Sequence, residues 1–224
     1  MMKKNPAALI FDLNGTMIDD MNYHIDAWHV ILNNLGAGLS RDKVKEECYG
    51  KNNEMLQRIF PSRFSLEEMN TMSLKKELAY QQSFKPKLKL LDGLNEFLEY
   101  AHKKSIKMAI ASAAIQSNVD FVLDGTNIRN YFSAIITAEN VKVSKPDPTC
   151  FLKAAEDLTV DPADCLVFED TPKGVEAALN AGMKALVITT IHEPAEFEQY
   201  SNVIGFHKDY TGLLRMLDQA VSAG

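Results

Sequence analysis

The sequence has few of the features that mark nucleic-acid-binding or membrane proteins. Its 24 Lys and Arg residues are outnumbered by 30 Asp and Glu residues, which gives a formal net charge of −6. No Lys/Arg-rich run is present, so the chain lacks the basic face that a phosphate backbone requires, and we expect no nucleic-acid partner. No apolar run approaches the roughly 18 residues of a membrane-spanning helix, so we expect no membrane association.

Cysteine is also scarce. The three residues, Cys48, Cys150 and Cys165, lie far apart and form neither a CxxC pair nor a Cys/His cluster with zinc-binding spacing. We therefore expect reduced thiols in a core. The apolar run near the N-terminus is too short for a signal peptide, so the expected location is the cytoplasm. We also expect a monomer.

Short apolar runs that end in polar loops are the main pattern in the remaining sequence. They span residues 7–11, 106–110, 134–137, 165–168 and 185–188. Segments of helical periodicity separate the later runs, at residues 91–102, 116–123, 148–157 and 172–181. Continuously apolar strands that alternate with helices indicate a parallel sheet covered on both faces. The predicted fold class is α/β, with a doubly wound, Rossmann-like parallel sheet.

A helical insert interrupts this alternation near the start of the chain. Between the first apolar run and residue 90, apolar residues recur at helical spacing and no comparable strand run occurs. We predict two domains: residues 1–18 and 88–224 form the α/β core domain, and residues 19–87 form an inserted α-helical domain.

Polar residues follow three of the apolar runs, where ligands bind in an open α/β sheet. The candidates are Asp12, Asn14, Gly15 and Thr16 after the first run, Ser112 and Ala113 after the second, Glu169 and Asp170 after the fourth, and Lys145 before a helix. Carboxylates at such an edge suit Mg²⁺, which also takes phosphate oxygens as ligands. Hydroxyl, ammonium and loop amide groups suit the phosphate itself. Individually, the same residues are also typical of Asx turns and helix N-termini.

Together these residues resemble the haloacid dehalogenase superfamily, and in particular its β-phosphoglucomutase-like phosphatases with a helical cap. The family's DxDGT motif corresponds to Asp12-Leu13-Asn14-Gly15-Thr16, its second motif to Ser112, its third to Lys145, and its acidic pair to Glu169-Asp170. The four motifs occur in the family's order and on the predicted strands, and the inserted helices lie where the family has its cap domain.

The resemblance implies a role for each motif residue. Asp12 would be the nucleophile that accepts the phosphoryl group, and water would then hydrolyse the aspartyl-phosphate. Mg²⁺ would be held by Asp12, Asp170 and the main-chain carbonyl of Asn14, with Glu169 close by. The transferring group would be bound by Ser112, Ala113, Lys145 and the amides of Gly15 and Thr16.

Asn14 departs from the family pattern. The second acidic residue of DxDGT protonates the leaving oxygen and then activates water, and an amide can do neither. We therefore expect slow turnover. The residue is either an engineered Asp-to-Asn change, which we favour because the rest of the site is intact, or a natural feature of an enzyme whose leaving group needs little protonation.

Four residues of the insert are candidates for substrate recognition. His24 matches the hinge histidine of the β-phosphoglucomutase group, although a structural role is as plausible, and Lys76 would reach the same crevice. Asn53 stands where that group has an arginine for a distal phosphate, which argues against a mutase. Glu47 would repel a bare phosphate unless a shared cation stood between them, and we count it as a candidate metal ligand.

These observations lead to three hypotheses. The first is a Mg²⁺-dependent phosphohydrolase for a small phosphate compound, with inorganic pyrophosphate as the most specific candidate substrate. The second is a sugar-phosphate phosphatase or β-phosphoglucomutase. The third is a catalytically silent phosphate-binding module, which Asn14 would permit.

Overall fold

The computed structural model of the chain describes residues 6–215, which divide into two compact units. The helical unit comprises residues 20–88, and the α/β unit comprises the described residues up to 19 and from 89 onward. The expected boundaries, after residues 18 and 87, differ from these by one residue at each crossing.

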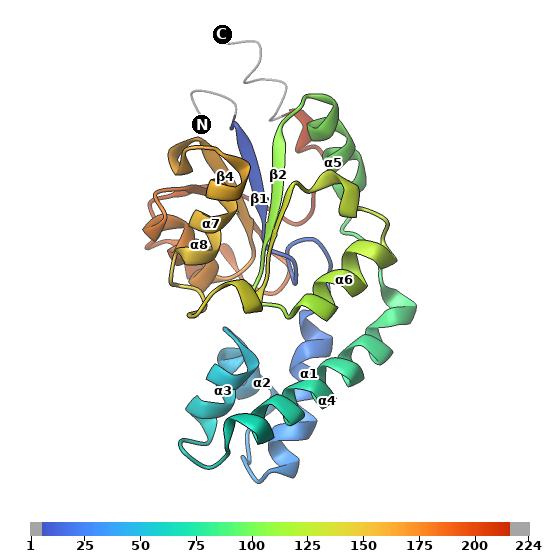
Figure 1. Cartoon of the computed structure of the whole chain (residues 1–224), viewed down its shortest axis with the longest axis vertical. Coiled ribbons are helices and arrows are strands. Elements are labelled where there is room, and N and C mark those ends of the chain that lie inside the picture. Colours follow the sequence, from blue (N-terminus) through green and yellow to red (C-terminus); the bar gives the residue numbers. More distant parts are fainter. Residues whose placement is uncertain (1–5, 216–224) are drawn as a thin grey trace. The chain divides into compact units, whose positions relative to one another are not determined.

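The α/β unit is built on a six-stranded sheet in the order β3-β2-β1-β4-β5-β6. Figure 1 shows the neighbouring strands β2, β1 and β4 of this sheet. The strands are β1 (Ala8–Phe11), β2 (Lys107–Ala111), β3 (Ala134–Ile136), β4 (Cys165–Glu169), β5 (Lys184–Ile188) and β6 (Val203–His207). Every neighbouring pair is parallel. The α/β fold class with a doubly wound parallel sheet is thereby confirmed.

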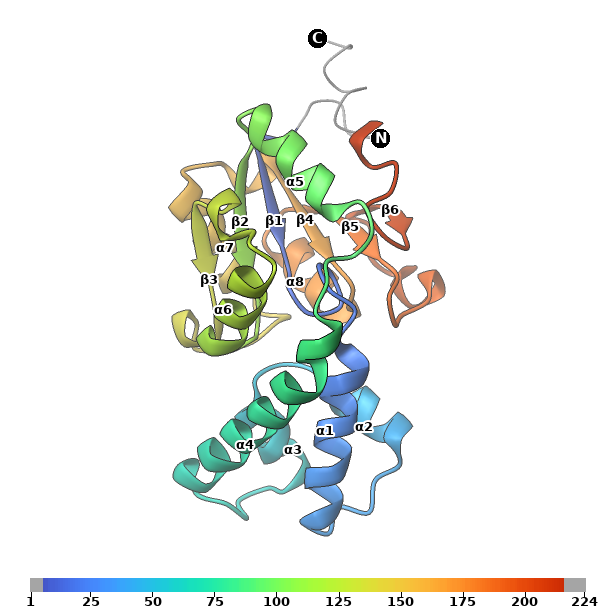
Figure 2. The same ribbon diagram turned by 90° about the vertical axis from the view of Figure 1, so that its right-hand side faces the viewer.

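Helices connect these strands, as βαβ units require. They are α5 (Leu94–Lys103), α6 (Gln116–Gly125), α7 (Thr149–Leu158) and α8 (Pro172–Asn180), and Figure 2 shows them around the sheet from a second direction. Each overlaps a segment that the sequence predicts to be helical.

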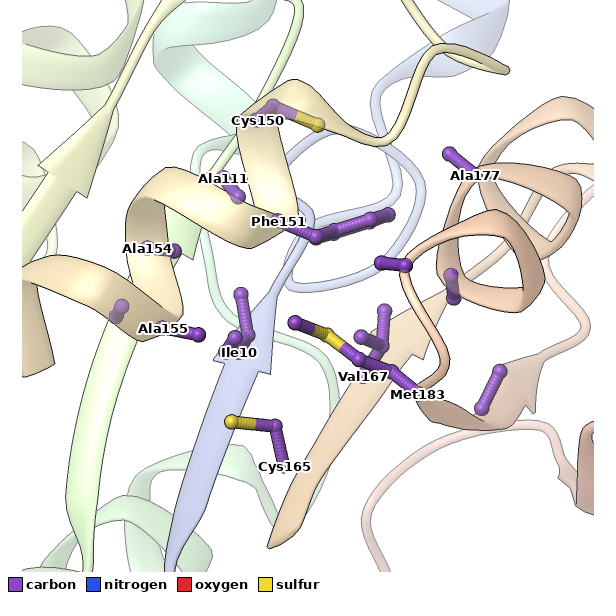
Figure 3. Packing of buried hydrophobic residues seen from close by; sticks show 14 of the residues in the cluster. Ile10, Ala111, Cys150, Phe151, Ala154, Ala155, Cys165, Val167, Ala177 and Met183 are labelled. Atoms are coloured by element: carbon purple, nitrogen blue, oxygen red, sulfur yellow. The ribbon is translucent and has the colours of Figure 1, made fainter. Parts of the chain in front are cut away.

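The central strands β1 and β4 are apolar up to Phe11 and Phe168 because both faces of the sheet are covered. Ala8 and Ile10 of β1 belong to a cluster with residues of α7 and α8, in which Phe151 of α7 inserts between the helices and the strands (Figure 3). On the other face, Phe11 of β1 stacks on Phe168 of β4 with a centroid distance of 4.7 Å, and Phe97 of α5 packs edge-on against both. This two-sided burial fixes the strand ends that carry the candidate site.

The helical unit consists of α1 (Met21–Asn34), α2 (Arg41–Glu47), α3 (Asn52–Ile59) and α4 (Leu66–Phe84). Its core contains Trp28, Leu32, Val44 and Leu56, all almost fully buried. α4 begins with a capping box, in which Ser65 Oγ accepts from the Glu68 amide and the Glu68 carboxylate accepts from the Ser65 amide. Among residues 6–215, no helix combines the length and apolarity needed to cross a membrane.

Candidate active site

The candidate residues of the α/β unit meet where the direction of the sheet connections reverses. β1 lies between β2 and β4; the chain goes from β1 toward β2 on one side, and from β4 toward β5 on the other. Such a switch point opens a crevice at the carboxyl ends of the two strands. The Asp12 amide donates to the Phe168 carbonyl at 2.9 Å, so Asp12 lies directly beside the start of the Glu169-Asp170 pair.

A buried lysine links the two strand ends. Lys145 Nζ lies 2.6 Å from Asp12 Oδ1 and 2.7 Å from Glu169 Oε1, and its side chain is 9% exposed. Burial acts to lower the pKa of Lys145, but the two carboxylates outweigh it and raise that pKa above its ordinary value. Lys145 is therefore a fixed ammonium group that contacts the carboxylate expected to act as nucleophile.

Glu169 is held on both oxygens by protein donors. Oε1 accepts from Lys145, and Oε2 accepts from the Asp170 amide at 2.9 Å, the Thr171 amide at 2.9 Å and the Thr171 hydroxyl at 3.0 Å. A Cβ on Gly174 would lie 1.8 Å from Oε1, so only glycine leaves room for this carboxylate beside α8. With both oxygens engaged, Glu169 is placed to orient Lys145.

Asp170 has one engaged oxygen and one that has no protein partner. Oδ1 accepts from the Thr16 hydroxyl at 3.0 Å, whereas Oδ2 is buried and has no hydrogen-bond partner in the described part of the chain. A buried carboxylate oxygen that lacks a donor costs free energy, which makes it a natural ligand for a cation.

The charge balance of the site also suits a divalent cation. Burial raises the pKa of Asp12 to about 7; Glu169 adds to the rise and Lys145 opposes it. Burial, followed by the charges of Glu169 and Asp12, raises the pKa of Asp170 well above its ordinary value. A positive ion at this site would favour the ionised forms of Asp12 and Asp170.

Mg²⁺ fits the donors available here. Residues 6–215 contain no group of three or more His, Cys, Asp or Glu side chains arranged as a metal site. Two carboxylates and a main-chain carbonyl are nevertheless a suitable set for Mg²⁺, which usually keeps several waters and takes phosphate oxygens alongside one or two carboxylates.

The phosphate-binding candidates lie on the neighbouring strand ends. Ser112 follows β2, is 3% exposed, and its Oγ accepts from the Ala114 amide at 3.2 Å. Its own amide donates to Ile136 on β3, which fixes the turn that also contains Ala113. Thr16 is fully buried within the loop that follows β1. These residues therefore border the same edge of the sheet as Asp12.

Two residues that sequence reasoning missed hold this loop from outside. Thr190 Oγ1 donates to the Gly15 carbonyl at 2.7 Å, and Tyr210 Oη donates to the Thr16 carbonyl at 3.1 Å. Thr190 follows β5, so the strand-end rule that selected Ser112 would also have selected it. Nothing in the local sequence indicates the contact made by Tyr210.

In the helical unit, His24 and Lys76 belong to one buried polar cluster. Lys76 Nζ lies 2.5 Å from His24 Nδ1 and 3.0 Å from Glu77 Oε1. Tyr80 Oη donates to Asp20 Oδ2 at 2.5 Å, and His24 Nε2 lies 3.3 Å from the same oxygen. Sequence reasoning missed Asp20, Glu77 and Tyr80.

Glu47 and Asn53 make other contacts in this unit. Glu47 Oε2 accepts from Arg58 Nε at 3.2 Å, and the Arg58 guanidinium also donates to the Glu47 carbonyl at 2.7 Å. Asn53 donates to Asn70 Oδ1 at 2.7 Å and accepts from Ser73 at 3.2 Å. The carboxylate expected to attract a cation is thus paired with an arginine.

An aspartate after the first strand, a lysine between two carboxylates and a buried acidic pair therefore meet at the carboxyl edge of a doubly wound sheet. The model of the haloacid dehalogenase-like hydrolase family matches residues 9–188 of this chain. The chain therefore belongs to the haloacid dehalogenase-like hydrolases, and its relatives place it in the β-phosphoglucomutase-like group.

Three similar proteins illustrate this relationship. The chain is 32% identical to β-phosphoglucomutase of Bacillus subtilis, over 80% of this chain and 81% of the relative. It is 30% identical to the fructose-1-phosphate phosphatase YqaB of Escherichia coli, over 83% of this chain and 97% of the relative. The solved structure of a family IA, variant 3 hydrolase from Entamoeba histolytica superposes with a TM-score of 0.83 at 27% identity, and the match covers 96% of this chain and 99% of that one.

Proposed function

We propose that this protein is a Mg²⁺-dependent phosphatase of small phosphorylated carbohydrates that transfers the phosphoryl group to Asp12. The observation that carries the proposal is the Lys145 ammonium group held between Asp12 and Glu169. The names of the relatives, a fructose-1-phosphate phosphatase and a β-phosphoglucomutase, support a carbohydrate substrate.

The first chemical step forms a bond between an Asp12 carboxylate oxygen and phosphorus while the bond from phosphorus to the leaving oxygen breaks. Lys145 and the Ser112 turn bind the oxygens of the transferring group, where negative charge must be stabilised. In the second step, water attacks the phosphorus and the bond between phosphorus and the Asp12 oxygen breaks. Inorganic phosphate, which takes up the water protons, leaves, and Asp12 is released as a carboxylate.

Mg²⁺ would be held by Asp12, the main-chain carbonyl of Asn14 and Asp170, and when bound it supplies charge that offsets the phosphoryl oxygens. Asp170 presents its buried Oδ2 for this role because Thr16 holds Oδ1. Glu169 keeps Lys145 against Asp12, and we assign it a positioning role in place of a metal-ligand role.

Asn14 limits this chemistry because its amide cannot protonate the leaving oxygen or activate water. Asn14→Asp should raise turnover of alkyl phosphates about 10²- to 10⁴-fold, the usual contribution of general acid–base catalysis. This expectation is the same whether Asn14 is engineered or natural. Activity of the variant should be lost in excess EDTA and restored by Mg²⁺.

The test is a substrate screen of Asn14→Asp and of the unchanged chain, with hexose phosphates, β-glucose 1-phosphate, nucleotides and pyrophosphate in the presence of Mg²⁺. We expect the hexose monophosphates to be hydrolysed fastest. A variant that remains inactive on every compound would contradict the proposal and favour the silent phosphate-binding module.

Inorganic pyrophosphate is the alternative substrate. The sequence supports it on three grounds: Asn53 replaces the arginine for a distal phosphate, the leaving group departs as a stabilised anion, and a carboxylate of the helical unit could share a cation. In the structure that carboxylate, Glu47, is paired with Arg58. We therefore place carbohydrate phosphates first. In the screen, pyrophosphate turnover that exceeds that of all hexose phosphates and falls at least about 10-fold in Glu47→Ala would reverse this order.

A further inference from the structure

Two hydroxyl groups outside the four family motifs hold the loop that follows β1. Thr190 lies after β5 and donates to the Gly15 carbonyl at 2.7 Å; Tyr210 lies after β6 and donates to the Thr16 carbonyl at 3.1 Å. The two acceptors are consecutive carbonyls of the loop that carries Asp12. The donors therefore fix two successive peptide groups next to the nucleophile.

The contact made by Thr190 determines where the Thr16 amide points. In a planar trans peptide, the carbonyl of one residue and the N–H of the next point in opposite directions. Since Thr190 holds the Gly15 carbonyl, the Thr16 N–H is directed away from Thr190. Thr16 is fully buried, yet within residues 6–215 its amide has no hydrogen-bond acceptor. A buried N–H without an acceptor is rare and indicates a ligand.

The contact made by Tyr210 also acts through Thr16, but it affects Asp170, which the Thr16 hydroxyl contacts. It anchors the main chain of Thr16, whose hydroxyl donates to Asp170 Oδ1. In the part of the chain that the structure describes, Asp170 Oδ2 has no hydrogen-bond partner. The Tyr210 ring is itself fixed, because it packs against Phe97 and Phe168 with centroid distances of 5.5 and 5.6 Å. Its amide donates to the Asp92 carbonyl at 2.9 Å. The donor oxygen consequently has little freedom to move.

We propose that Thr190 and Tyr210 are positioning residues of the phosphoryl-transfer site. Thr190 directs the Thr16 amide at the transferring phosphoryl group, and Tyr210 holds Thr16 so that Asp170 presents Oδ2 to the cation. Neither side chain touches the reacting atoms, and both act through Thr16. The assignment of roles rests on the proposed function.

The role of Thr190 is tested with Thr190→Val, Thr190→Ser and the control Thr189→Val. Valine keeps the shape and removes the hydroxyl, whereas serine restores it. Thr189 lies next to Thr190, but its hydroxyl donates to the His207 carbonyl at 3.3 Å and does not contact the Asp12 loop. In the Asn14→Asp background, with an aryl phosphate as substrate, Thr190→Val should lower kcat about 10-fold and change KM less than about 2-fold.

Thr190→Ser and Thr189→Val should keep kcat within about 2-fold of the parent. In addition, Thr190→Val should weaken inorganic phosphate binding in the presence of Mg²⁺, measured by calorimetry, about 5-fold or more. A kcat loss shared equally by Thr189→Val, or a loss that serine does not rescue, would overturn this role.

The role of Tyr210 is tested by Mg²⁺ titration calorimetry of the otherwise unchanged chain. Tyr210→Phe keeps the ring and should weaken Mg²⁺ binding about 10-fold, as loss of a group that orients a metal ligand does. The control Tyr200→Phe removes the hydroxyl of a half-buried tyrosine on the other face of the sheet and should leave the affinity unchanged. Equal Mg²⁺ affinities in the two variants would overturn the role of Tyr210.

These readouts separate the inference from the proposed function. If Asn14→Asp hydrolyses no phosphate ester, the proposed function fails. The phosphate and Mg²⁺ affinities of the Thr190 and Tyr210 variants would still report whether the two hydroxyls set the geometry of the site.

Discussion

At the scale of single residues, the site depends on a series of side chains that hold one another by ion pairs and hydrogen bonds. Lys145 is buried between Asp12 and Glu169, and Glu169 in turn is fixed by the amides of Asp170 and Thr171. In such a series of contacts, the position of Lys145 depends on Glu169, and the position of Glu169 depends on the groups that hold it. A change beside Glu169 should therefore affect Asp12.

Gly174→Ala tests this dependence. The added Cβ would overlap the Glu169 carboxylate at 1.8 Å, so Glu169 must move and Lys145 loses one of its two anionic partners. In the Asn14→Asp background we expect kcat to fall at least about 10-fold, measured with an aryl phosphate.

Gly205→Ala is the matched control. Gly205 lies in β6, and the nearest atom to its added Cβ, the His207 ring Nε2, is at an ordinary distance of 3.7 Å. We expect this variant to retain parental activity. Equal losses in the two variants would show that the defect is not transmitted through Glu169.

At the scale of secondary-structure elements, the sequence was sufficient to predict a strand where both faces of that strand are buried. β1 and residues 165–168 of β4 are continuous apolar runs, and their predicted ends locate Asp12 and the acidic pair. β6 was missed because it is an edge strand of half-buried and exposed residues interrupted by Gly205, which gives no apolar run. The contacts of Thr190 and Tyr210 were missed because they join positions 175 and 194 residues apart.

The sequence also could not say which oxygens of the acidic pair are available. Glu169 and Asp170 both carry a carboxylate. Only the fold shows that both oxygens of Glu169 accept from donors, whereas one oxygen of Asp170 has no partner among residues 6–215. Similarly, the pairing of Glu47 with Arg58 depends on how α2 and α3 pack.

The helices of the helical unit are joined by the buried polar cluster, which makes a prediction at this scale. Lys76 on α4 contacts His24 on α1 and also Glu77, all of them buried. Lys76→Met should destabilise the unit by about 3 kcal/mol, since removal of one partner leaves a buried charge without compensation.

Trp28 provides a local readout of this change. It is the only tryptophan of the sequence, is 1% exposed, and lies in the core of the helical unit. Urea unfolding followed by Trp28 fluorescence should show the lower free energy of unfolding of Lys76→Met. The control Lys75→Met, on the exposed face of α4, should change that free energy by less than about 0.5 kcal/mol. No difference between the two variants would show that the cluster does not stabilise the unit.

At the scale of the whole molecule, the chain combines a helical unit with an α/β unit that contains the residues proposed to transfer the phosphoryl group. The helical unit contains the four residues that the sequence offers for substrate recognition, His24, Glu47, Asn53 and Lys76, and their role stays a prediction. A mutase and a phosphatase both align over about four-fifths of the chain.

The measurement that tests the central claim most directly is detection of a phosphoryl group on Asp12. Acetyl phosphate is a suitable donor because its leaving carboxylate needs no protonation, so the absence of an acid at Asn14 should not block the first step. The same absence should slow hydrolysis of the aspartyl-phosphate. Acid-quenched peptide mapping by mass spectrometry, after incubation with Mg²⁺ and acetyl phosphate, should therefore find the Asp12 peptide phosphorylated. The modification should be absent in Asp12→Asn, and a phosphoryl group on another residue, or phosphatase activity retained by Asp12→Asn in the Asn14→Asp background, would contradict the account.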